Sequence, residues 1–309
     1  MNMAHPTIQS CCIVAVAFLA IGAGSSFAQQ RWSASLTDGS SVPRSIVEET
    51  RAKAPGGLPD GLIETHDGKG DIAAAWYAVP TTRYRHGILG DAVEASALMV
   101  RTRDGVTLSL DLPATEVFED RYPRLADLDG DGKIEIIAIR SSISLGASVT
   151  VYGLKGGTLV QHASTRFIGR ANRWLNIAGI ASFRGTPRKE IAFVETPHIG
   201  GTLFLYEYVE GRLKQVGSMR GFSNHIMGST EMRLSAVADI NGDGRPDLAL
   251  PSDDRRSLRL VGFTNNVLTE FASARLPARI DKAIAVKGSG PKAGFIVGLE
   301  NGEIHKVHR

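Results

Sequence analysis

Two nine-residue loops carry oxygen-bearing side chains at a spacing that suits a metal ion. The first, Asp127 to Glu135, reads DLDGDGKIE, and the second, Asp239 to Asp247, reads DINGDGRPD. Both place Asp or Asn at positions 1, 3 and 5, an acid at position 9, and glycines between them. A hard cation such as Ca²⁺ takes about six to eight oxygen ligands at short range. The spacing therefore predicts a calcium site in each loop.

Two other structures use similar residues. An EF-hand needs flanking helices and a glutamate at loop position 12. That position is Ala138 in one loop and Leu250 in the other, and short β-like apolar runs flank both loops, which excludes the EF-hand. A metal-free Asp–Gly turn between two strands is the remaining alternative. Its clustered acidic side chains would repel one another without compensation, which favours calcium.

Composition limits the other function classes. The chain has 309 residues, of which 43% are hydrophobic and 22% are charged, with a net charge of +3. This length is enough for one large domain or two ordinary ones. The Lys and Arg residues are interleaved with acids instead of forming basic runs, so nucleic acid is not an expected partner.

The first 28 residues differ from the rest. Residues 11–24 are uncharged and mostly apolar, and a small-x-small pattern ends at Ala28, which predicts a signal peptide at 1–28 and a single mature domain at 29–309. The apolar stretch is shorter than a membrane span. An uncleaved anchor is the alternative, because no Lys or Arg precedes this stretch. Cys11 and Cys12 are the only cysteines, so a bacterial periplasmic or secreted protein without disulfides is predicted, with no membrane span after cleavage.

The strands around the acidic loops repeat along the chain. Arg121 and Arg233 each lie six residues before a loop, and three apolar strands follow each loop. Another unit opens at Arg173 without an acidic loop, and a last one opens at Arg279 with three strands. A unit near the amino end, residues 62–110, keeps acids only at the fifth and ninth loop positions, and no metal is predicted there.

Repeats of 46 to 60 residues between successive opening arginines indicate a β-propeller. The predicted fold is all-β, with five blades of four antiparallel strands, or six if residues 40–60 hold a further unit. The last unit lacks a strand, and Arg31 to Leu36 is predicted to supply it from the amino end. Such closure would cover an otherwise open sheet edge. A pair of β-sandwiches is the alternative fold.

At these residues the chain resembles FG-GAP/VCBS-repeat proteins, whose calcium-binding propeller repeats also occur in integrin α-subunit heads. The match is specific in the two loops and loose over residues 62–309. In that family the loop follows the innermost strand and binds structural calcium on the lower face of the ring. The resemblance implies two Ca²⁺ ions, with these ligands: Asp127, Asp129, Asp131, Glu135 and the Lys133 carbonyl, and Asp239, Asn241, Asp243, Asp247 and the Arg245 carbonyl.

The four opening arginines form a second candidate set. If each innermost strand runs down to the acidic loop, Arg121, Arg173, Arg233 and Arg279 begin strands on the opposite, upper face. Four guanidinium groups around one mouth would attract a carboxylate, a phosphate or an acidic sugar. The alternative is that each arginine pairs with a nearby acid or caps a strand end.

Histidines are predicted on the same upper face. His86 and His198 lie in loops after a second strand, and His225 precedes Arg233. With Glu231 they could assemble a metal or acid–base centre, although most loop histidines are ordinary surface residues. Trp76 and Trp174 could form a sugar-stacking platform, but their alternation with apolar residues favours core packing.

Three functions are compatible with these patterns. The main prediction is a non-enzymatic, calcium-stabilised propeller that binds a protein or another macromolecule through its upper loops. The first alternative is a carbohydrate-binding, lectin-like propeller. The second is a hydrolase or lyase on the face opposite the calcium loops, which requires the histidines and arginines to converge in one pocket.

Overall fold

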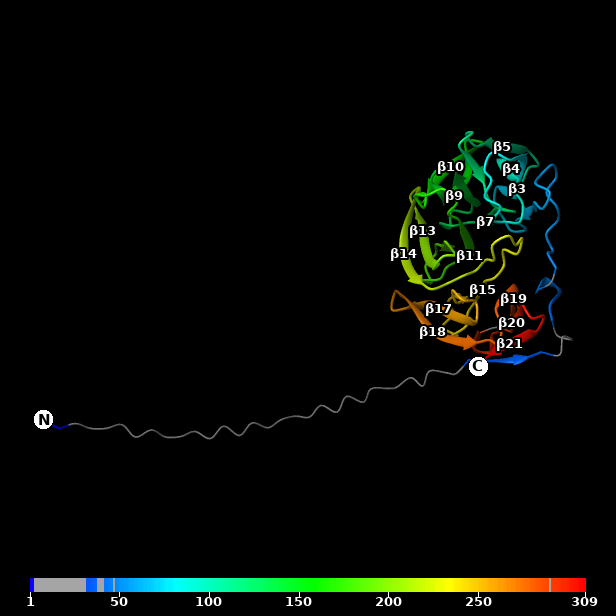
Figure 1. The fold of residues 1–309 in the computed structure, drawn as a ribbon. Coiled ribbons are helices and arrows are strands. Elements are labelled where there is room, and N and C mark those ends of the chain that lie inside the picture. The colour runs from blue at the N-terminus through cyan, green and yellow to red at the C-terminus, as the bar shows by residue number, and fades with distance from the viewer. Residues whose placement is uncertain (3–31, 38–41, 47, 289) are drawn as a thin grey trace.

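A computed structural model gives the fold. It describes residues 1–2, 32–37, 42–46, 48–288 and 290–309 (Figure 1). The predicted signal peptide and its cleavage site, apart from residues 1 and 2, lie outside the described residues. Across those described ranges, no helix is long and apolar enough to cross a membrane.

The described residues form antiparallel β-sheets with two short 3-10 helices and no α-helix, which confirms the predicted fold class. The helices are η1 (Arg44–Ile46) and η2 (Gly290–Lys292). The strands are β1 (Ser33–Leu36), β2 (Glu64–Thr65), β3 (Ile72–Thr81), β4 (Glu94–Thr102), β5 (Thr107–Asp111), β6 (Glu116–Phe118), β7 (Arg124–Ala126), β8 (Glu135–Ser142), β9 (Gly146–Lys155), β10 (Thr158–Ser164), β11 (Leu175–Ala181), β12 (Glu190–Glu195), β13 (Thr202–Val209), β14 (Arg212–Arg220), β15 (Ala236–Ala238), β16 (Asp247–Pro251), β17 (Ser257–Thr264), β18 (Val267–Arg275), β19 (Ile280–Lys287), β20 (Gly294–Leu299) and β21 (Ile304–His308).

Consecutive strands pair into four-stranded units. The units are β2–β5, β7–β10, β11–β14, β15–β18 and β19–β21 with β1. In Figure 1 the first strands β7, β11 and β15 lie toward the middle, while β5, β10, β14 and β18 lie toward the outside. Neighbouring units touch through both sets of strands. This is the arrangement of propeller blades.

The amino-terminal strand completes the last unit, as predicted. β1 pairs antiparallel with β21, from Ser33 opposite His308 to Leu36 opposite His305. Trp32, just before β1, packs its ring 6.1 Å from that of Phe295 on β20. The unit therefore takes its fourth strand from the other end of the chain, which removes an open edge.

The first two units are joined, which the sequence analysis did not predict. Strand β6 pairs with β8 over three residues and with β4 at one position, so both units belong to one nine-stranded sheet. Three residues are too short for a periodic pattern. The described part of 40–60 contains η1, which packs on β19 and β20, and no strand, so it adds no sixth unit.

The second strand of each later unit lies at the centre of the core. β8, β12, β16 and β20 are buried at almost every position. Both side-chain faces are covered because neighbouring sheets stack on either side. These strands are therefore mostly apolar in sequence, and the loops described below begin or end at them.

Candidate active site and candidate calcium loops

Strand direction places the loops on two faces. The acidic loops join the first strand of a unit to the second, on what we call the lower face. Turns alternate between faces in an antiparallel meander, so the loops after the second strands and the connections between units lie on the opposite, upper face.

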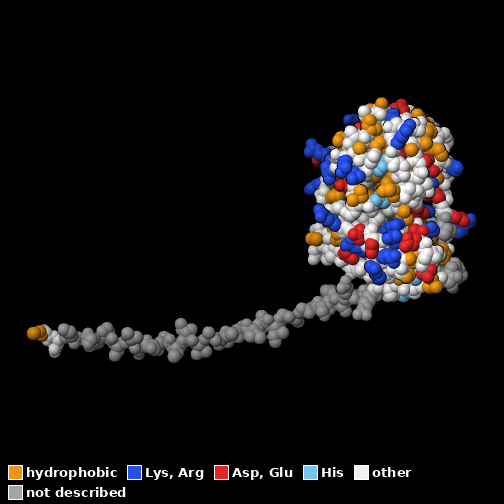
Figure 2. Space-filling view, in the orientation of Figure 1, with side chains coloured by type: hydrophobic (Ala, Val, Ile, Leu, Met, Phe, Trp, Pro, Cys, Tyr) orange, Lys and Arg blue, Asp and Glu red, His pale blue; other side chains and the backbone are white. Residues whose placement is uncertain are grey.

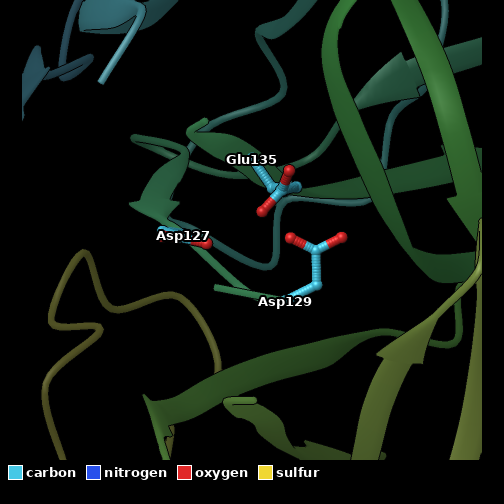
Figure 3. A group of neighbouring side chains, drawn as sticks. All are labelled: Asp127, Asp129 and Glu135. Atoms are coloured by element: carbon cyan, nitrogen blue, oxygen red, sulfur yellow. The ribbon is translucent and has the colours of Figure 1, made fainter. Parts of the chain in front are cut away.

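The first acidic loop, β7 to β8, folds around its own carboxylates. Both oxygens of Asp127 accept backbone amides, from Gly130 at 2.7 Å and Gly132 at 3.1 Å. Ligand oxygens of Asp127, Asp129 and Glu135 lie within 4.8 Å of one another. Figure 3 shows the Asp129 and Glu135 carboxylates facing each other, with Asp127 beside them. Three of the predicted ligands are thus assembled.

The second loop, β15 to β16, repeats this geometry. Asp239 accepts the amides of Gly242 at 2.7 Å and Gly244 at 3.0 Å. Among its differences from the first loop, the Arg245 guanidinium lies 2.5 Å from a carboxylate oxygen of Asp243. In the first loop the corresponding Lys133–Asp131 distance is 3.6 Å. Of the remaining predicted ligands, Asn241 accepts the Asp243 amide at 2.8 Å.

The ninth residue of each loop is a buried acid. Glu135 is 4% exposed and accepts the Leu128 amide at 2.7 Å, and Asp247 is 1% exposed and accepts the Ile240 amide at 3.0 Å. Burial, together with neighbouring loop acids, raises the pKa of Glu135 to about 7 and that of Asp247 to about 6. Positive charge beside these groups would relieve the cost of ionising them, so the donor set fits a hard cation.

In the third unit an arginine lies beside the acid at the ninth position of the same turn. Its ninth residue, Glu190, accepts the amide of Phe183 at 2.8 Å, as the acids of the other loops do. Arg184, at the third position, donates to Glu190 at 2.8 Å and pairs with Glu207 at 2.7 Å. A guanidinium therefore stands beside the buried acid where the two acidic loops have Asp or Asn.

In the first unit an arginine also contacts the loop between the first two strands. Arg103 donates to the carbonyl oxygens of His66 at 2.8 Å and Gly68 at 2.7 Å. The acid at the ninth position, Asp71, accepts the amide of Ile134 at 2.9 Å, across the boundary with the next unit. This loop is thus held by contacts within the protein.

The four opening arginines do not share one cavity. Ion pairs join Arg121 to Asp60 at 2.9 Å, Arg233 to Glu231 at 2.7 Å, and Arg279 to Glu300 at 3.7 Å. Arg173, Arg233 and Arg279 line three different cavities. Among the described residues no carboxylate lies within 4.0 Å of the Arg173 guanidinium, and Arg173 lines the same cavity as two of the histidines.

The three histidines converge on the upper face. A cavity of about 270 Å³ is lined by His86, Arg173, Trp174, His198 and Met227, among others. His225 is not part of this lining but hydrogen-bonds to His198. These residues come from connections and loops of different units. Figure 2 shows histidine side chains surrounded by hydrophobic ones on the viewed face.

A hydrogen-bond chain fixes the tautomers of two histidines. His225 Nε2 lies 2.9 Å from the Ser229 carbonyl oxygen, which can only accept, so Nε2 carries a proton. In the neutral ring, Nδ1 of His225 then accepts from Nε2 of His198, at 3.0 Å. In this tautomer the other ring nitrogen of His198, Nδ1, carries the lone pair. That atom can accept a proton.

Both rings are held in the neutral form. Burial, with help from Arg255 and His86, lowers the pKa of His198 to about 4. Burial and His198 lower the pKa of His225 to about 3. The Trp174 ring stacks on His198 with centroids 6.2 Å apart and packs on His225 at 4.6 Å. Trp174, only 2% exposed, supports the histidines, and Trp76 is buried in the core.

His86 has a different partner. Its Nδ1 lies 2.5 Å from Oε1 of Glu119, which is fully buried and also accepts the Ser141 hydroxyl. Burial raises the pKa of Glu119, and the hydrogen bond from His86 opposes that rise. The prediction that Glu231 would complete the centre is replaced, because Glu231 pairs with Arg233 and Glu119 takes its place. Glu119 lies 33 residues from His86, and no local pattern connects them.

Comparisons with known proteins give weak matches. No protein-family model matches the sequence, and no curated protein does. Among solved structures, the exotype rhamnogalacturonan lyase YesX matches with a TM-score of 0.47 and 16% identity, over 82% of this chain and 48% of the lyase. The rhamnogalacturonan lyase YesW matches with a TM-score of 0.46 and 15% identity, over 83% and 50%. BBS1N, solved with ARL6DN, matches with a TM-score of 0.44 and 10% identity, over 81% and 66%. The chain thus spans about half the length of each lyase.

The predicted non-enzymatic interaction module needs correction. Two of these three neighbours are rhamnogalacturonan lyases. The prediction also treated the histidines as separate surface residues, whereas two line one cavity and the third bonds to one of them. The condition set for the enzymatic alternative, convergence in one pocket, is met in part, because His86, His198 and Arg173 line one cavity while His225 and the other three arginines do not.

Proposed function

We propose that the chain acts on an acidic polysaccharide, as a lyase that cleaves it by β-elimination in the upper-face cavity. The observation that carries this proposal is the cavity lined by His198, by the Glu119-bound His86 and by Arg173, whose guanidinium has no carboxylate partner among the described residues. A base, an anion-binding group and a candidate acid therefore lie around one space. That is the minimum set for eliminating an alkoxide from a uronic acid.

Arg173 binds the uronate carboxylate and stabilises the negative charge that develops when the adjacent carbon loses its proton. Its guanidinium is available because no described carboxylate pairs with it. A fork of N–H donors matches a carboxylate in geometry and charge. The same interaction orients the sugar so that the carbon–hydrogen bond next to the carboxylate faces the histidines.

His198 is the base. Its Nδ1 takes the proton from the carbon α to the carboxylate, the electron pair of that bond forms the carbon–carbon double bond, and the bond from the β carbon to the glycosidic oxygen breaks. His86 is the acid, because it donates Nδ1–H to Glu119 and gives its Nε2 proton to the leaving oxygen. Neutral His198 and carboxylate-bound His86 differ in environment, as paired acid–base roles require.

The lower-face loops serve stability in this proposal. Asp127, Asp129 and Glu135, with their counterparts in the second loop, would hold Ca²⁺, which neutralises the clustered acids and fixes the turn. The third unit supports this, since it places the Arg184 guanidinium beside its own buried acid. Export remains part of the same proposal, because a polysaccharide substrate lies outside the cell.

The test is incubation of the full chain with polygalacturonate, with rhamnogalacturonan and with a neutral galactan. The ultraviolet absorbance of the unsaturated uronate product is followed. We expect product from at least one acidic polymer and none from the galactan. His198→Gln and Arg173→Gln are each expected to lower turnover by about 100-fold or more, while His66→Gln, on the lower face, retains activity.

Two results would contradict the proposal. One is the absence of unsaturated product from both acidic polymers with a folded wild-type chain. The other is product formation that both cavity variants leave unchanged, because the activity would then reside elsewhere on the molecule.

A further inference from the structure

A second upper-face cavity lies beside the first. It has a volume of about 350 Å³ and shares His198 and Met227 with the first cavity. Its far side carries Arg255, in the loop between β16 and β17, and Arg279, at the start of the last unit. The histidine pair thus has an arginine on either side, Arg173 in one cavity and Arg255 in the other.

Arg255 is held in place without an ionic partner. Its backbone has a φ of 55°, a left-handed conformation that is uncommon for a residue with a side chain. The guanidinium reaches the Ile280 carbonyl oxygen at 3.4 Å, and among the described residues no carboxylate lies within 4.0 Å of it. Burial and the charge of Arg279 lower its pKa. Two cations therefore face one cavity with incomplete compensation.

The acids that line this cavity have other partners. Asp254 accepts the Ser252 hydroxyl at 2.6 Å and the Arg256 amide at 2.9 Å, and lies 3.7 Å from the Arg275 guanidinium. Asp253 accepts the amide of Asp254 at 2.9 Å. Neither is within ion-pair distance of Arg255. Arg255 therefore keeps N–H donors that no described carboxylate engages.

We propose that this second cavity, with Arg255 as its main donor and Arg279 beside it, is a subsite for another carboxylate of the same acidic glycan. The inference rests on the proposed function, and it specifies the substrate as an oligomer or polymer with charged units on both sides of His198. Both cavities are lined by His198 and Met227, so one glycan chain that occupied both would cross these two residues. Exposed Met227, at 65%, is common to both cavities and offers an apolar contact for a sugar ring.

Binding of oligogalacturonates of one to four units, measured by calorimetry on the full chain at low and high salt, tests this subsite. We expect the wild-type chain to bind the tetramer at least tenfold more tightly than the monomer. Arg255→Gln should weaken tetramer binding roughly tenfold, the value of one charge-assisted contact, and leave monomer binding unchanged. Arg173→Gln should weaken both, and Arg255→Lys should restore part of the tetramer affinity.

The control is Arg212→Gln, which removes an exposed arginine of a lower-face turn and should change neither ligand's affinity. The subsite is wrong if Arg255→Gln alters monomer and tetramer binding equally or not at all, or if a neutral oligogalactan shows the same gain with length. Failure of the lyase chemistry is distinguishable, because length-dependent uronate binding without unsaturated product would sustain the subsite and overturn the reaction.

Discussion

His198 Nε2 lies 3.0 Å from His225 Nδ1, and the opposite nitrogen of His225 lies 2.9 Å from the Ser229 carbonyl oxygen. The carbonyl oxygen cannot donate, so while both rings are neutral the hydrogen bonds can run in one direction only, from His198 to His225 to the Ser229 carbonyl. His225 thereby determines which nitrogen of His198 is basic. Adding a proton to either ring means placing a charge in a buried site, which explains why both pKa values are low.

We expect acidification to destabilise the folded chain through these two rings. Their folded pKa values, about 4 and about 3, lie below the ordinary 6.5. As the pH falls from about 6.5 to about 4, the unfolded state therefore takes up protons that the folded state does not, and the free energy of unfolding decreases. The measurement is the difference in urea midpoint between wild type and His225→Gln at pH 7 and at pH 5, because Glu135 and Asp247, with pKa values raised to about 7 and about 6, act with the opposite sign over this range.

His225→Gln should reduce this loss between pH 7 and pH 5, because one of the two low-pKa groups is gone. His66→Gln, outside the cavity, should keep the wild-type pH dependence. An identical fall in midpoint for wild type and His225→Gln would show that the ring takes up its proton readily in the folded state.

Arg184 gives a second prediction, on the third unit. Arg184→Gln leaves Glu190 buried beside its strand without the guanidinium, so we expect the free energy of unfolding to fall by about 2 kcal/mol. Replacing Glu190 by Gln as well should recover part of that loss. Arg188→Gln, in the same loop and without an ion pair, is the matched control. Additive effects in the double variant, measured by urea unfolding, would mean that the pair is not coupled.

Features formed by residues close together in the sequence could be predicted, whereas contacts between residues far apart in the sequence mostly could not. The acidic loops and the strand runs around them are local patterns, and the closing strand β1 followed from the strand that the last unit lacks. The partner of His86 could not be found this way, because Glu119 reaches it only after two units pack together. Strand β6 was not predicted, because three residues are too few to show the alternation of apolar and polar side chains that indicates a strand. The ion pair of Arg233 with Glu231 could be predicted, because the two residues are two positions apart. The ion pair of Arg121 with Asp60 could not, because they are 61 residues apart.

The closing strand gives a third prediction. Trp32 packs against Phe295, and Arg309 lies over the Trp32 ring at 5.6 Å. Trp32→Ala should remove this anchor and lower the free energy of unfolding by about 3 kcal/mol, as for other buried aromatic residues. A chain that begins after Leu36 should lose more, because β21 then becomes an open edge. Unchanged urea midpoints in both variants would show that β1 is dispensable.

The two acidic loops give the last prediction, which concerns their difference. Added Ca²⁺ should raise the unfolding temperature of the full chain more than Mg²⁺ does, and a chelator should reverse the rise. A site filled at 100 times its dissociation constant contributes about 2.7 kcal/mol. Asp129→Ala and Asp243→Ala should each remove part of the effect, while Asp111→Asn, an exposed acid on β5, should leave it intact.

The second loop should bind more weakly than the first. The Arg245 guanidinium lies 2.5 Å from Asp243 and must give up that carboxylate before a cation can take it, whereas the Lys133 ammonium is 3.6 Å from Asp131. Calcium titration by calorimetry should therefore resolve a tighter and a weaker site. Arg245→Ala should bring the weaker site toward the tighter one and leave the first loop unchanged. If that variant weakens calcium binding instead, the guanidinium supports the site, and the competition inferred from its contact with Asp243 does not operate.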